Sequence, residues 1–151
     1  MRILQARPEH LDLLTPLFIA YREFHGQPTL PDTSRSFLAE RLQQQDSVIY
    51  LALADDEDQL LGFCQLFPSF SSLTLRRVWI LNDIYVAGDA RRQLVADRLL
   101  QTAKQMARDS KAVRMRAATL KGNDTARRLY ESIGFREDDQ FSNFLLPLND
   151  A

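Results

Sequence analysis

The stretch "NDIYVAGDARRQLVADRLLQ", Asn82–Gln101, places an apolar strand directly before a long amphipathic helix. The strand-like run, rich in β-branched and aromatic residues, ends at Gly88, and the apolar residues after it recur at helical spacing. Between them stand Arg91 and Arg92, in a chain whose net charge is only −1. The junction raises the question of which negatively charged group these arginines serve.

A helix N-terminus is a natural binding place for an anion. Its first four backbone N–H groups have no partner within the helix, and the helix dipole adds partial positive charge there. Arg91 and Arg92 would contribute charge-assisted hydrogen bonds to phosphate oxygens at the same point. We therefore expect the arginines and the amides to share one anionic ligand. The alternative, that both arginines are surface residues of a first helical turn, stays open on this dipeptide alone.

Length and composition limit the class of protein. A chain of 151 residues, 45% of them hydrophobic, can close one core but not two, which predicts a single domain over residues 1–151. The only cysteine, Cys64, excludes an internal disulfide and a multi-cysteine metal site, so we expect no metal and a cytoplasmic, reducing location. No apolar run approaches the roughly 20 residues of a membrane span, and "MRILQARPEH" lacks the apolar region of a signal peptide. No membrane association is expected.

Charge is distributed unevenly along the chain. From Arg91 to Arg128 there are eleven Lys and Arg against three acids, a charge of +8, so the rest of the chain carries −9. A compact anionic ligand held by this segment would explain the distribution, although long helices also simply display solvated Arg and Lys. The segment does not interleave basic residues with exposed aromatics, so nucleic acid is not an expected partner.

Periodicity and turn signals predict a mixed sheet with helices packed on its faces. Pro68 and the serines after it are expected to end the strand that they follow. The expected elements are a strand over 1–6, a helix from Pro8 that stops before the turn 25–28, a helix over about Ser34–Gln44, strands over Ser47–Leu53, Leu60–Phe67 and Leu75–Val86, a helix ending near Ser110, a strand over Ala112–Ala118, a short helix within 122–135, and one or two strands around Phe141–Leu146.

Two stretches, "DIYVAGDARRQLVADRLL" and "NDTARRLYESIGF", resemble the signature stretches of the GNAT superfamily of acyl-CoA-dependent N-acyltransferases. The resemblance implies an α/β (α+β) fold with a mixed, mostly antiparallel sheet of six to seven strands, a splayed central parallel pair and about four helices on its faces. It also implies acetyl-CoA as co-substrate, the amine of a small molecule or peptide as acceptor, and a homodimer as a reasonable assembly.

In that family a turn of pattern R/Q-x-x-G-x-G/A cradles the pyrophosphate of acetyl-CoA. Leu94 stands here where the family usually has glycine. A residue in helical conformation can offer its amide whatever its side chain, so we expect weakened rather than abolished binding. One alternative is that Leu94 blocks the site in a degenerate member that no longer turns over. Another is a catalytically inactive module that binds acyl-CoA. The residues matching the turn are Arg91, Arg92, Gln93, Leu94, Val95 and Ala96.

The strand before this turn carries the implied reaction site. By resemblance, the backbone of Ile84, Tyr85 and Val86 would hold the pantetheine arm, often beside a bulge. An alkylammonium with a pKa of about 10.4 is almost fully protonated at pH 7, so a base should help the amine to react. Asp83 is the best candidate, because burial in an apolar strand favours a carboxyl that can bind a proton. The alternatives for Asp83 are a structural hydrogen bond or the binding of a cationic substrate.

The second stretch supplies the other site residues. By resemblance, Tyr130 lies near the sulfur of CoA and donates a hydrogen bond to the departing thiolate, while Asn123 and Ala126 contact the same cofactor. Tyr130 could instead be a packed helix aromatic, and Asn123 could cap its helix. Glu23 is a weaker candidate for the base. Cys64 is expected to be a small buried hydrophobe rather than a nucleophile.

Overall fold

Strands and helices are distributed along the part of the chain that the computed structural model describes, residues 1–56, 59–88 and 92–149. In chain order they are β1 (Arg2–Gln5), the 3₁₀ helix η1 (Pro8–His10), α1 (Leu11–Phe24), α2 (Pro31–Gln44), β2 (Val48–Leu53), β3 (Leu60–Ser71), β4 (Arg76–Val86), α3 (Arg92–Asp109), β5 (Arg114–Ala117) and α4 (Asp124–Ile133). The expected order of elements is confirmed from β1 to α4.

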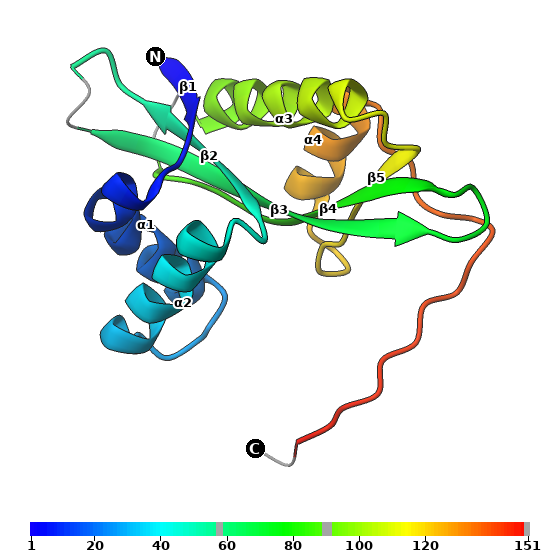
Figure 1. The fold of residues 1–151 in the computed structure, drawn as a ribbon, viewed down its shortest axis with the longest axis horizontal. Helices are drawn as coiled ribbons and strands as arrows, with labels where there is room; N and C mark the ends of the chain where they lie inside the picture. Colours follow the sequence, from blue (N-terminus) through cyan, green and yellow to red (C-terminus); the bar gives the residue numbers. More distant parts are fainter. Residues whose placement is uncertain (57–58, 89–91, 150–151) are drawn as a thin grey trace.

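The strands form one mixed sheet in the order β1-β2-β3-β4-β5. The first four strands pair antiparallel with their neighbours, and β4 pairs parallel with β5. Helices α1 and α2 lie on one side of the sheet, and α3 and α4 lie on the other (Figure 1). The mixed sheet and the four α-helices agree with expectation, but the expected number of six to seven strands is wrong, because the described residues form five.

The missing strands are those expected around Phe141–Leu146. Residues 141–149 form neither helix nor strand, and all of them are exposed. A strand exists only where a neighbour accepts and donates its backbone hydrogen bonds. This segment runs away from the sheet of its own chain (Figure 1), so its extended sequence pattern finds no partner strand there.

The expectation that Pro68 ends its strand is also wrong. Strand β3 continues to Ser71, and Pro68 lies opposite Trp79 of β4. On its other side β3 pairs with β2 only as far as Leu66, opposite Val48. Beyond Leu66 this side of β3 is therefore a sheet edge, where the missing N–H of a proline costs no ladder bond.

Two buried clusters lie on the two faces of the sheet. The residues of α1 and α2 pack with one set of sheet side chains, and those of α3 and α4 pack with the other. The first cluster consists of Ala6, Leu14, Phe18, Leu38, Leu42, Ile49, Leu51 and Phe63. The second consists of Ala52, Cys64, Leu66, Trp79, Leu81, Val86, Val95, Ala96, Leu99, Leu100, Ala103, Ala107 and Ile133. Alternation along β2 and β3 divides neighbouring residues between these clusters.

Strand β4 changes its neighbours halfway along its length. Gln65 lies opposite Asp83 and Leu66 lies opposite Leu81, so Asn82 is an extra residue, a β-bulge. Parallel pairing with β5 covers only Val78–Leu81, whereas β4 continues to Val86. From the bulge onward, β4 therefore has a strand partner on one side only. We call the open side of β4 over residues 82–86 the split.

None of the helices in the described ranges is long and apolar enough to cross a membrane.

Candidate functional site

Arg92, the first residue of α3, lies at the junction between β4 and α3. A Cβ on Gly88 would collide with Nη2 of Arg92, so the guanidinium occupies the space where another residue would carry its side chain. Glycine at position 88 thus lets the cation fold back over the end of the strand. Asp89, Ala90 and Arg91 lie outside the described residues, and the role expected of Arg91 stays a prediction.

In the first turn of α3, one side of the helix faces solvent and the other faces the sheet. Leu94 is 56% exposed, whereas Val95 and Ala96 pack into the core beneath the helix. The side chain of Leu94 is therefore not buried against the sheet. As in any helix, the first four amides of α3 have no carbonyl partner within it. The junction thus places these amides beside the guanidinium of Arg92.

Close packing holds the strand and the helix together at this junction. A Cβ on Gly62 of β3 would stand 2.9 Å from the carbonyl oxygen of Tyr85 and 3.2 Å from Cγ1 of Val95. Only glycine leaves room for β3, β4 and α3 to meet this closely. The short approach fixes the end of β4 relative to the start of α3.

The backbone of β4 turns polar groups into the split. Ala87 donates its N–H to the carbonyl of Leu61 at 2.9 Å, directly across the β3–β4 ladder. Because hydrogen-bonded and non-bonded pairs alternate in an antiparallel ladder, Ile84 and Val86 direct their N–H and C=O groups away from β3. Past Leu81 no β5 residue pairs with them. This edge can bond an extended ligand, whereas the backbone of Tyr85 faces β3.

Asp83 is buried, 7% exposed, and accepts hydrogen bonds from three side chains. Tyr21 Oη donates to Oδ1 at 2.7 Å and Gln65 Nε2 donates to Oδ2 at 2.7 Å, while Asn82 Nδ2 lies 3.1 Å from both oxygens. Every contact uses the carboxylate as acceptor, which is the arrangement that suits an ionised group. Burial, and then the adjacent charge of Asp83, raise the pKa of Tyr21.

Gln65 is 1% exposed and holds its amide in one orientation. Ser47 Oγ donates to Oε1 of Gln65 at 2.9 Å, which directs the Nε2 donor to Asp83. The chain of hydrogen bonds therefore runs from Ser47, the residue before β2, through Gln65 of β3 to Asp83 of β4. These supporting residues were not predicted from the sequence, because nothing local marks a polar residue in β3 as a partner of β4.

Tyr130 of α4 lies close enough to Asp83 for the charge of the carboxylate to act on its phenol. The pKa of the Tyr130 phenol is raised, first by burial and then by the negative charge of Asp83. Its ring packs against Phe135, with the ring centroids 5.3 Å apart. Asp83 and Tyr130 thus interact electrostatically, although they lie 47 positions apart in the sequence.

Helix α4 carries Tyr130 and has defined ends. Asn123 Oδ1 accepts the N–H of Ala126 at 3.1 Å, so the side chain of Asn123 caps the helix. Gly134 ends the helix at φ 116°, and Lys104 of α3 donates its Nζ to the carbonyl of Ile133 at 2.8 Å. Capping and the contact with α3 together fix the position of α4, the helix that carries Tyr130.

The weaker candidates do not join Asp83. Glu23 is exposed and accepts a hydrogen bond from Thr29 at 3.0 Å. Cys64 is fully buried on the α3 side of the sheet, and burial raises the pKa of its thiol to about 12, so it is not a thiolate nucleophile at neutral pH.

Four rings gather on the α1 side of Asp83. Tyr21 lies within 5.9 Å of Tyr85 and 4.8 Å of His25, as measured between ring centroids. Phe24, which is 67% exposed, lies 5.9 Å from Tyr85. We call Tyr21, Phe24, His25 and Tyr85 the aromatic group. It provides an apolar surface beside a buried carboxylate.

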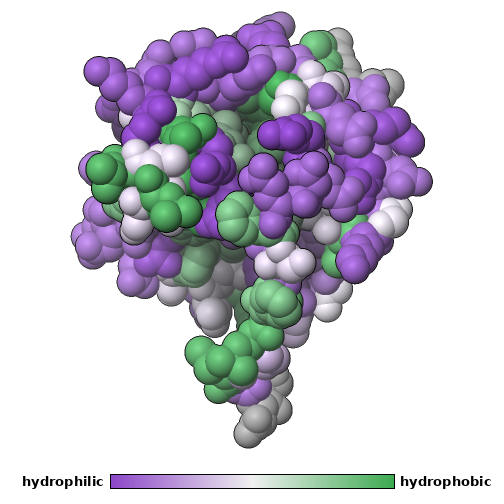
Figure 2. Space-filling model, turned by 90° about the vertical axis from the view of Figure 1, so that its right-hand side faces the viewer, coloured by the Kyte–Doolittle hydropathy of each residue, from purple (hydrophilic) through white to green (hydrophobic). Residues whose placement is uncertain are grey.

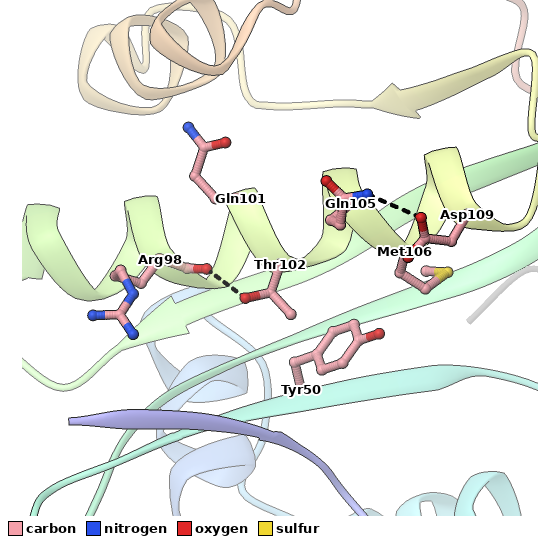
Figure 3. A pocket seen from close by; sticks show the side chains of 7 residues that line it. All are labelled: Tyr50, Arg98, Gln101, Thr102, Gln105, Met106 and Asp109. Carbon is pink, nitrogen blue, oxygen red and sulfur yellow. Dashed lines mark hydrogen bonds between the residues drawn. The ribbon is translucent and has the colours of Figure 1, made fainter.

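Two hollows of the surface lie away from Asp83 and Tyr130. One, of about 510 Å³, lies between α3 and β2 and is lined by Tyr50, Arg98, Gln101, Thr102, Gln105, Met106 and Asp109 (Figure 3). Some of its polar side chains form hydrogen bonds with one another, since Nε2 of Gln105 donates to Oδ1 of Asp109 at 2.9 Å. The other, of about 750 Å³, lies between η1 and the end of α2 and includes Ser47. The described residues contain no cluster of three or more side chains that could hold a metal ion.

The fold, the split and the comparisons together define the class of this protein. Residues 12–135 match the model of the acetyltransferase (GNAT) family, and the chain belongs to that family. It is 38% identical to the uncharacterized N-acetyltransferase YhfO of Bacillus subtilis (strain 168), over 97% of each chain. It is 32% identical to a probable acetyltransferase of Haemophilus influenzae, over 99% of each chain. A crystal structure of a probable acetyltransferase is 67% identical, covers 100% of both chains and superposes with a TM-score of 0.97.

Proposed function

We propose that this protein transfers the acetyl group of acetyl-CoA to an amine by direct attack, without a covalent enzyme intermediate. The observation that carries the proposal is the split, where β4 leaves β5 after Leu81, with Asp83 on this part of β4 and Tyr130 within reach of its charge. Membership of the acetyltransferase (GNAT) family supports the class of reaction. In this reaction the carbonyl carbon of the acetyl group would lose its bond to the sulfur of CoA and form a bond to the nitrogen of the amine.

Acetyl-CoA, the co-substrate, would lie along the split with its diphosphate at the start of α3. The guanidinium of Arg92 and the first four amides of α3, those of residues 92–95, supply donors for the diphosphate. The pantetheine arm would pair with the polar groups of Ile84 and Val86 that face away from β3. Asn123 and Ala126, at the start of α4, border the arm from the other side.

Asp83 is proposed to attract the cationic amine and to take the proton that the amine loses. Its charge lies in a buried position, so an ammonium close to it is attracted more strongly than in water. The three donors around it hold the carboxylate in place while an amine approaches. The neutral amine then attacks the thioester carbon, so that a C–N bond forms and the C–S bond breaks. The nitrogen gives its second proton to the departing thiolate, and the amide and the thiol of CoA result.

Tyr130 is proposed to donate a hydrogen bond to the leaving sulfur. The raised pKa of its phenol keeps the hydroxyl protonated at neutral pH, as a donor must be. A phenol is also a weaker acid than a thiol, whose ordinary pKa is about 8.5, so complete proton transfer to the thiolate is uphill. Stabilisation of the departing charge through a hydrogen bond is therefore the role assigned to Tyr130.

The aromatic group suggests which amines to test. A primary amine whose body is aromatic or aliphatic would lay that body on Phe24 and Tyr85 and present its nitrogen to Asp83. Removing such apolar surface from water contributes about 25 cal/mol per Å². We therefore expect arylalkylamines to have a lower KM than short amines such as ethylamine, with peptide N-termini and polyamines completing the panel.

Calorimetric titration with acetyl-CoA, followed by thiol-release assays on this panel, tests the proposal. We expect binding in the micromolar to low millimolar range, and a kcat for Tyr130→Phe that is lower by about 10-fold to 100-fold. Tyr50→Phe is the matched control, since Tyr50 is also half-buried but lies in the hollow between α3 and β2. Asp83→Asn should lower kcat/KM for the amines of the panel, because it removes both the negative charge and the proton acceptor. Absence of acetyl-CoA binding would exclude the proposed function.

A second candidate function is an acyl-CoA-binding module that does not transfer the acyl group. It is favoured by Leu94, which stands where the family usually carries glycine. Under this alternative acetyl-CoA binds, yet Tyr130→Phe and Asp83→Asn leave every measurable turnover unchanged. The same assays therefore separate the two functions.

A further inference from the structure

Most polar side chains of this protein lie at its surface, as the largely hydrophilic face in Figure 2 shows, but two buried ones are bonded to each other. Gln65 and Asp83 are both buried, and Nε2 of Gln65 donates to Oδ2 of Asp83 at 2.7 Å. The other end of the same amide, Oε1, accepts a hydrogen bond from Ser47 at 2.9 Å. Burying an amide is costly unless both of its ends find partners. Ser47 and Asp83 supply those partners.

The charge of Asp83 is stabilised by neutral groups alone in the described parts of the chain. Its hydrogen-bond partners there are Tyr21, Gln65 and Asn82. A buried carboxylate without a cation is costly, so it stays ionised only as far as its donors stabilise the charge. Removal of a donor that nothing replaces should therefore favour the protonated form.

Gln65 is the donor that water cannot replace. Asn82 is exposed and Tyr21 is half-buried, so water can reach the places that their side chains would leave. The bond from Gln65 lies in the interior, at a residue that is 1% exposed. A hydrogen bond in such surroundings is electrostatically stronger than one in water. The ionised state of Asp83 should therefore depend on Gln65 more than on the other two donors.

Ser47 decides which end of the amide meets Asp83. A glutamine amide has nearly the same shape when it turns by half a rotation, but the turn exchanges its donor and its acceptor. The turned amide would direct Oε1 at the carboxylate, and two oxygens would then face each other. The hydroxyl of Ser47 donates to Oε1 and so favours the orientation that is observed. Hydrogen bonds in a chain also polarise one another, so this bond strengthens the next one.

We propose that Gln65, oriented by Ser47, is a positioning residue that keeps Asp83 ionised and in place for the amine. The inference rests on the proposed function, in which Asp83 attracts the ammonium and takes its proton. Ser47 acts through Gln65 and touches neither substrate. The amide is a donor at one end and an acceptor at the other, so the chain of hydrogen bonds holds the carboxylate and does not carry its proton away.

The pH dependence of kcat/KM for phenethylamine, an arylalkylamine, tests the positioning. Gln65→Met keeps the length of the side chain and loses the donor, and Ser47→Ala removes the hydroxyl. Each variant is compared with the parent at the same pH, so that the titration of the amine cancels. We expect the loss to be greatest at acidic pH, about 10-fold for each pH unit by which protonation of Asp83 moves upward, and to vanish toward about pH 8. The same loss at every pH would overturn the inference.

Two serine variants are the matched controls. Ser47→Thr keeps a hydroxyl and should restore the profile of the parent. Ser110→Ala removes a hydroxyl that accepts a bond from Nε1 of Trp79 at 2.9 Å, at the end of α3, and should leave the profile unchanged. Ser47 belongs to neither buried cluster, so Ser47→Ala keeps the test available if Gln65→Met does not fold. A Ser47→Ala profile identical to that of the parent would contradict the role of Ser47.

Other titratable groups near Asp83 do not produce the expected change. The charge of Asp83 acts on Tyr21 of α1, Cys64 of β3 and Tyr130 of α4, and burial is the first cause that raises the pKa of each. All three therefore stay protonated from about pH 5 to pH 8. His25 lies 4.8 Å from Tyr21 between ring centroids, and histidine titrates in this range. The upward shift should persist in His25→Asn, and its disappearance there would overturn the inference.

NMR of the side-chain amide of Gln65 reads the same contact without any substrate. Its two N–H signals are identified in a ¹H–¹⁵N spectrum by their loss in Gln65→Met. We expect them to shift with pH as Asp83 takes up a proton, and to lose this titration in Asp83→Asn. The midpoint should be higher in Ser47→Ala than in the parent and in Ser47→Thr. Equal midpoints in the three chains would overturn the inference.

The two experiments distinguish failure of this inference from failure of the proposed function. A parent chain that neither binds acetyl-CoA nor acetylates an amine would exclude the proposed function. The NMR titration would then still decide whether Ser47 and Gln65 keep Asp83 ionised. A chain that acetylates phenethylamine but whose amide midpoint ignores Ser47 would overturn the inference alone.

Discussion

Cys64 is a single buried residue whose chemistry can be tested by pH. Burial raises the pKa of its thiol to about 12 from 9.0, so the folded chain keeps this proton at a pH where the unfolded chain has lost it. The unfolded state gains stability by releasing this proton as the pH rises, whereas the folded state does not. The free energy of unfolding therefore falls above about pH 9. The raised pKa of Tyr21 acts in the same direction.

We predict that Cys64 lowers the free energy of unfolding by roughly 1 kcal/mol between pH 8 and pH 10. Urea denaturation at both values measures this change. Cys64→Ala serves as the control, because it lacks the titrating group and should show a smaller decrease. Equal decreases in the two chains would show that the thiol titrates alike in the folded and unfolded states.

Leu94 is the residue at which this chain departs from the family pattern. Its exposed side chain and its helical backbone predict that Leu94→Gly acts in two opposite ways. Loss of the Cβ would let a diphosphate approach the amides, so acetyl-CoA should bind several-fold more tightly. Glycine in a helix also costs about 1 kcal/mol of stability.

Calorimetry and thermal denaturation of Leu94→Gly and Leu94→Ala measure both effects. Alanine keeps helix propensity, so Leu94→Ala should improve binding in part without loss of stability. Weaker acetyl-CoA binding in both variants would mean that leucine itself contributes to the site.

Residue-level analysis of the sequence predicts Asp83 and Tyr130 as the reacting groups, which stays a prediction, and it misses the side chains that donate hydrogen bonds to Asp83. Asp83 and Tyr130 are recognisable because each stands in a patterned stretch. Tyr21 and Gln65 donate to Asp83 from 62 and 18 positions away, and no local pattern connects such residues. Hydrogen-bond partners across strands depend on register, and the bulge at Asn82 shifts that register.

At the scale of elements, α4 depends on the glycine that ends it. Gly134 has φ 116°, a conformation that disfavours any side chain, while the nearest atom to an added Cβ is Lys104 Nζ at 3.7 Å. Space is therefore available, and the cost of Gly134→Ala is conformational, about 1 to 2 kcal/mol.

Urea denaturation of Gly134→Ala and Gly134→Asn measures this cost. Asparagine tolerates the left-handed region better and should destabilise less. Thiol release should also fall in Gly134→Ala, because α4 positions Tyr130. Three chains of equal stability would contradict the conformational argument.

Elements with strong periodicity were predictable, and those that depend on neighbours were not. Helix α3 was predicted from its apolar stripe because that stripe faces the sheet along its full length. The end of β3 was not, since Pro68 breaks a strand only where its nitrogen must pair. The strands expected around Phe141–Leu146 fall in a segment with phenylalanine and leucine, but such a composition does not supply a partner strand.

At the scale of the whole molecule, the uneven distribution of charge along the chain corresponds to particular elements of the fold. The segment that carries +8 forms α3, β5 and the start of α4, the elements that border the split or begin beside it. Some of its cations have structural partners, as when Arg127 bonds Glu137 at 2.9 Å. The rest of the chain, with −9, contributes the aromatic group and Asp83 on the other side. The positive excess thus lies on the side proposed for acetyl-CoA and the negative excess on the side proposed for the amine.

This opposition predicts how salt affects the two substrates. CoA bears several phosphate charges, and the attraction between exposed charges is screened beyond a Debye length of about 10 Å at 0.1 M salt. Raising salt from 50 to 500 mM should therefore weaken acetyl-CoA binding several-fold, as measured by calorimetry. Dephospho-CoA, which lacks one phosphate, should bind more weakly at low salt and approach CoA at high salt. Arg92→Ala should flatten the salt dependence for both ligands, because it removes the cation at the junction. A salt dependence that is the same with and without Arg92 would place the phosphates elsewhere on the +8 segment.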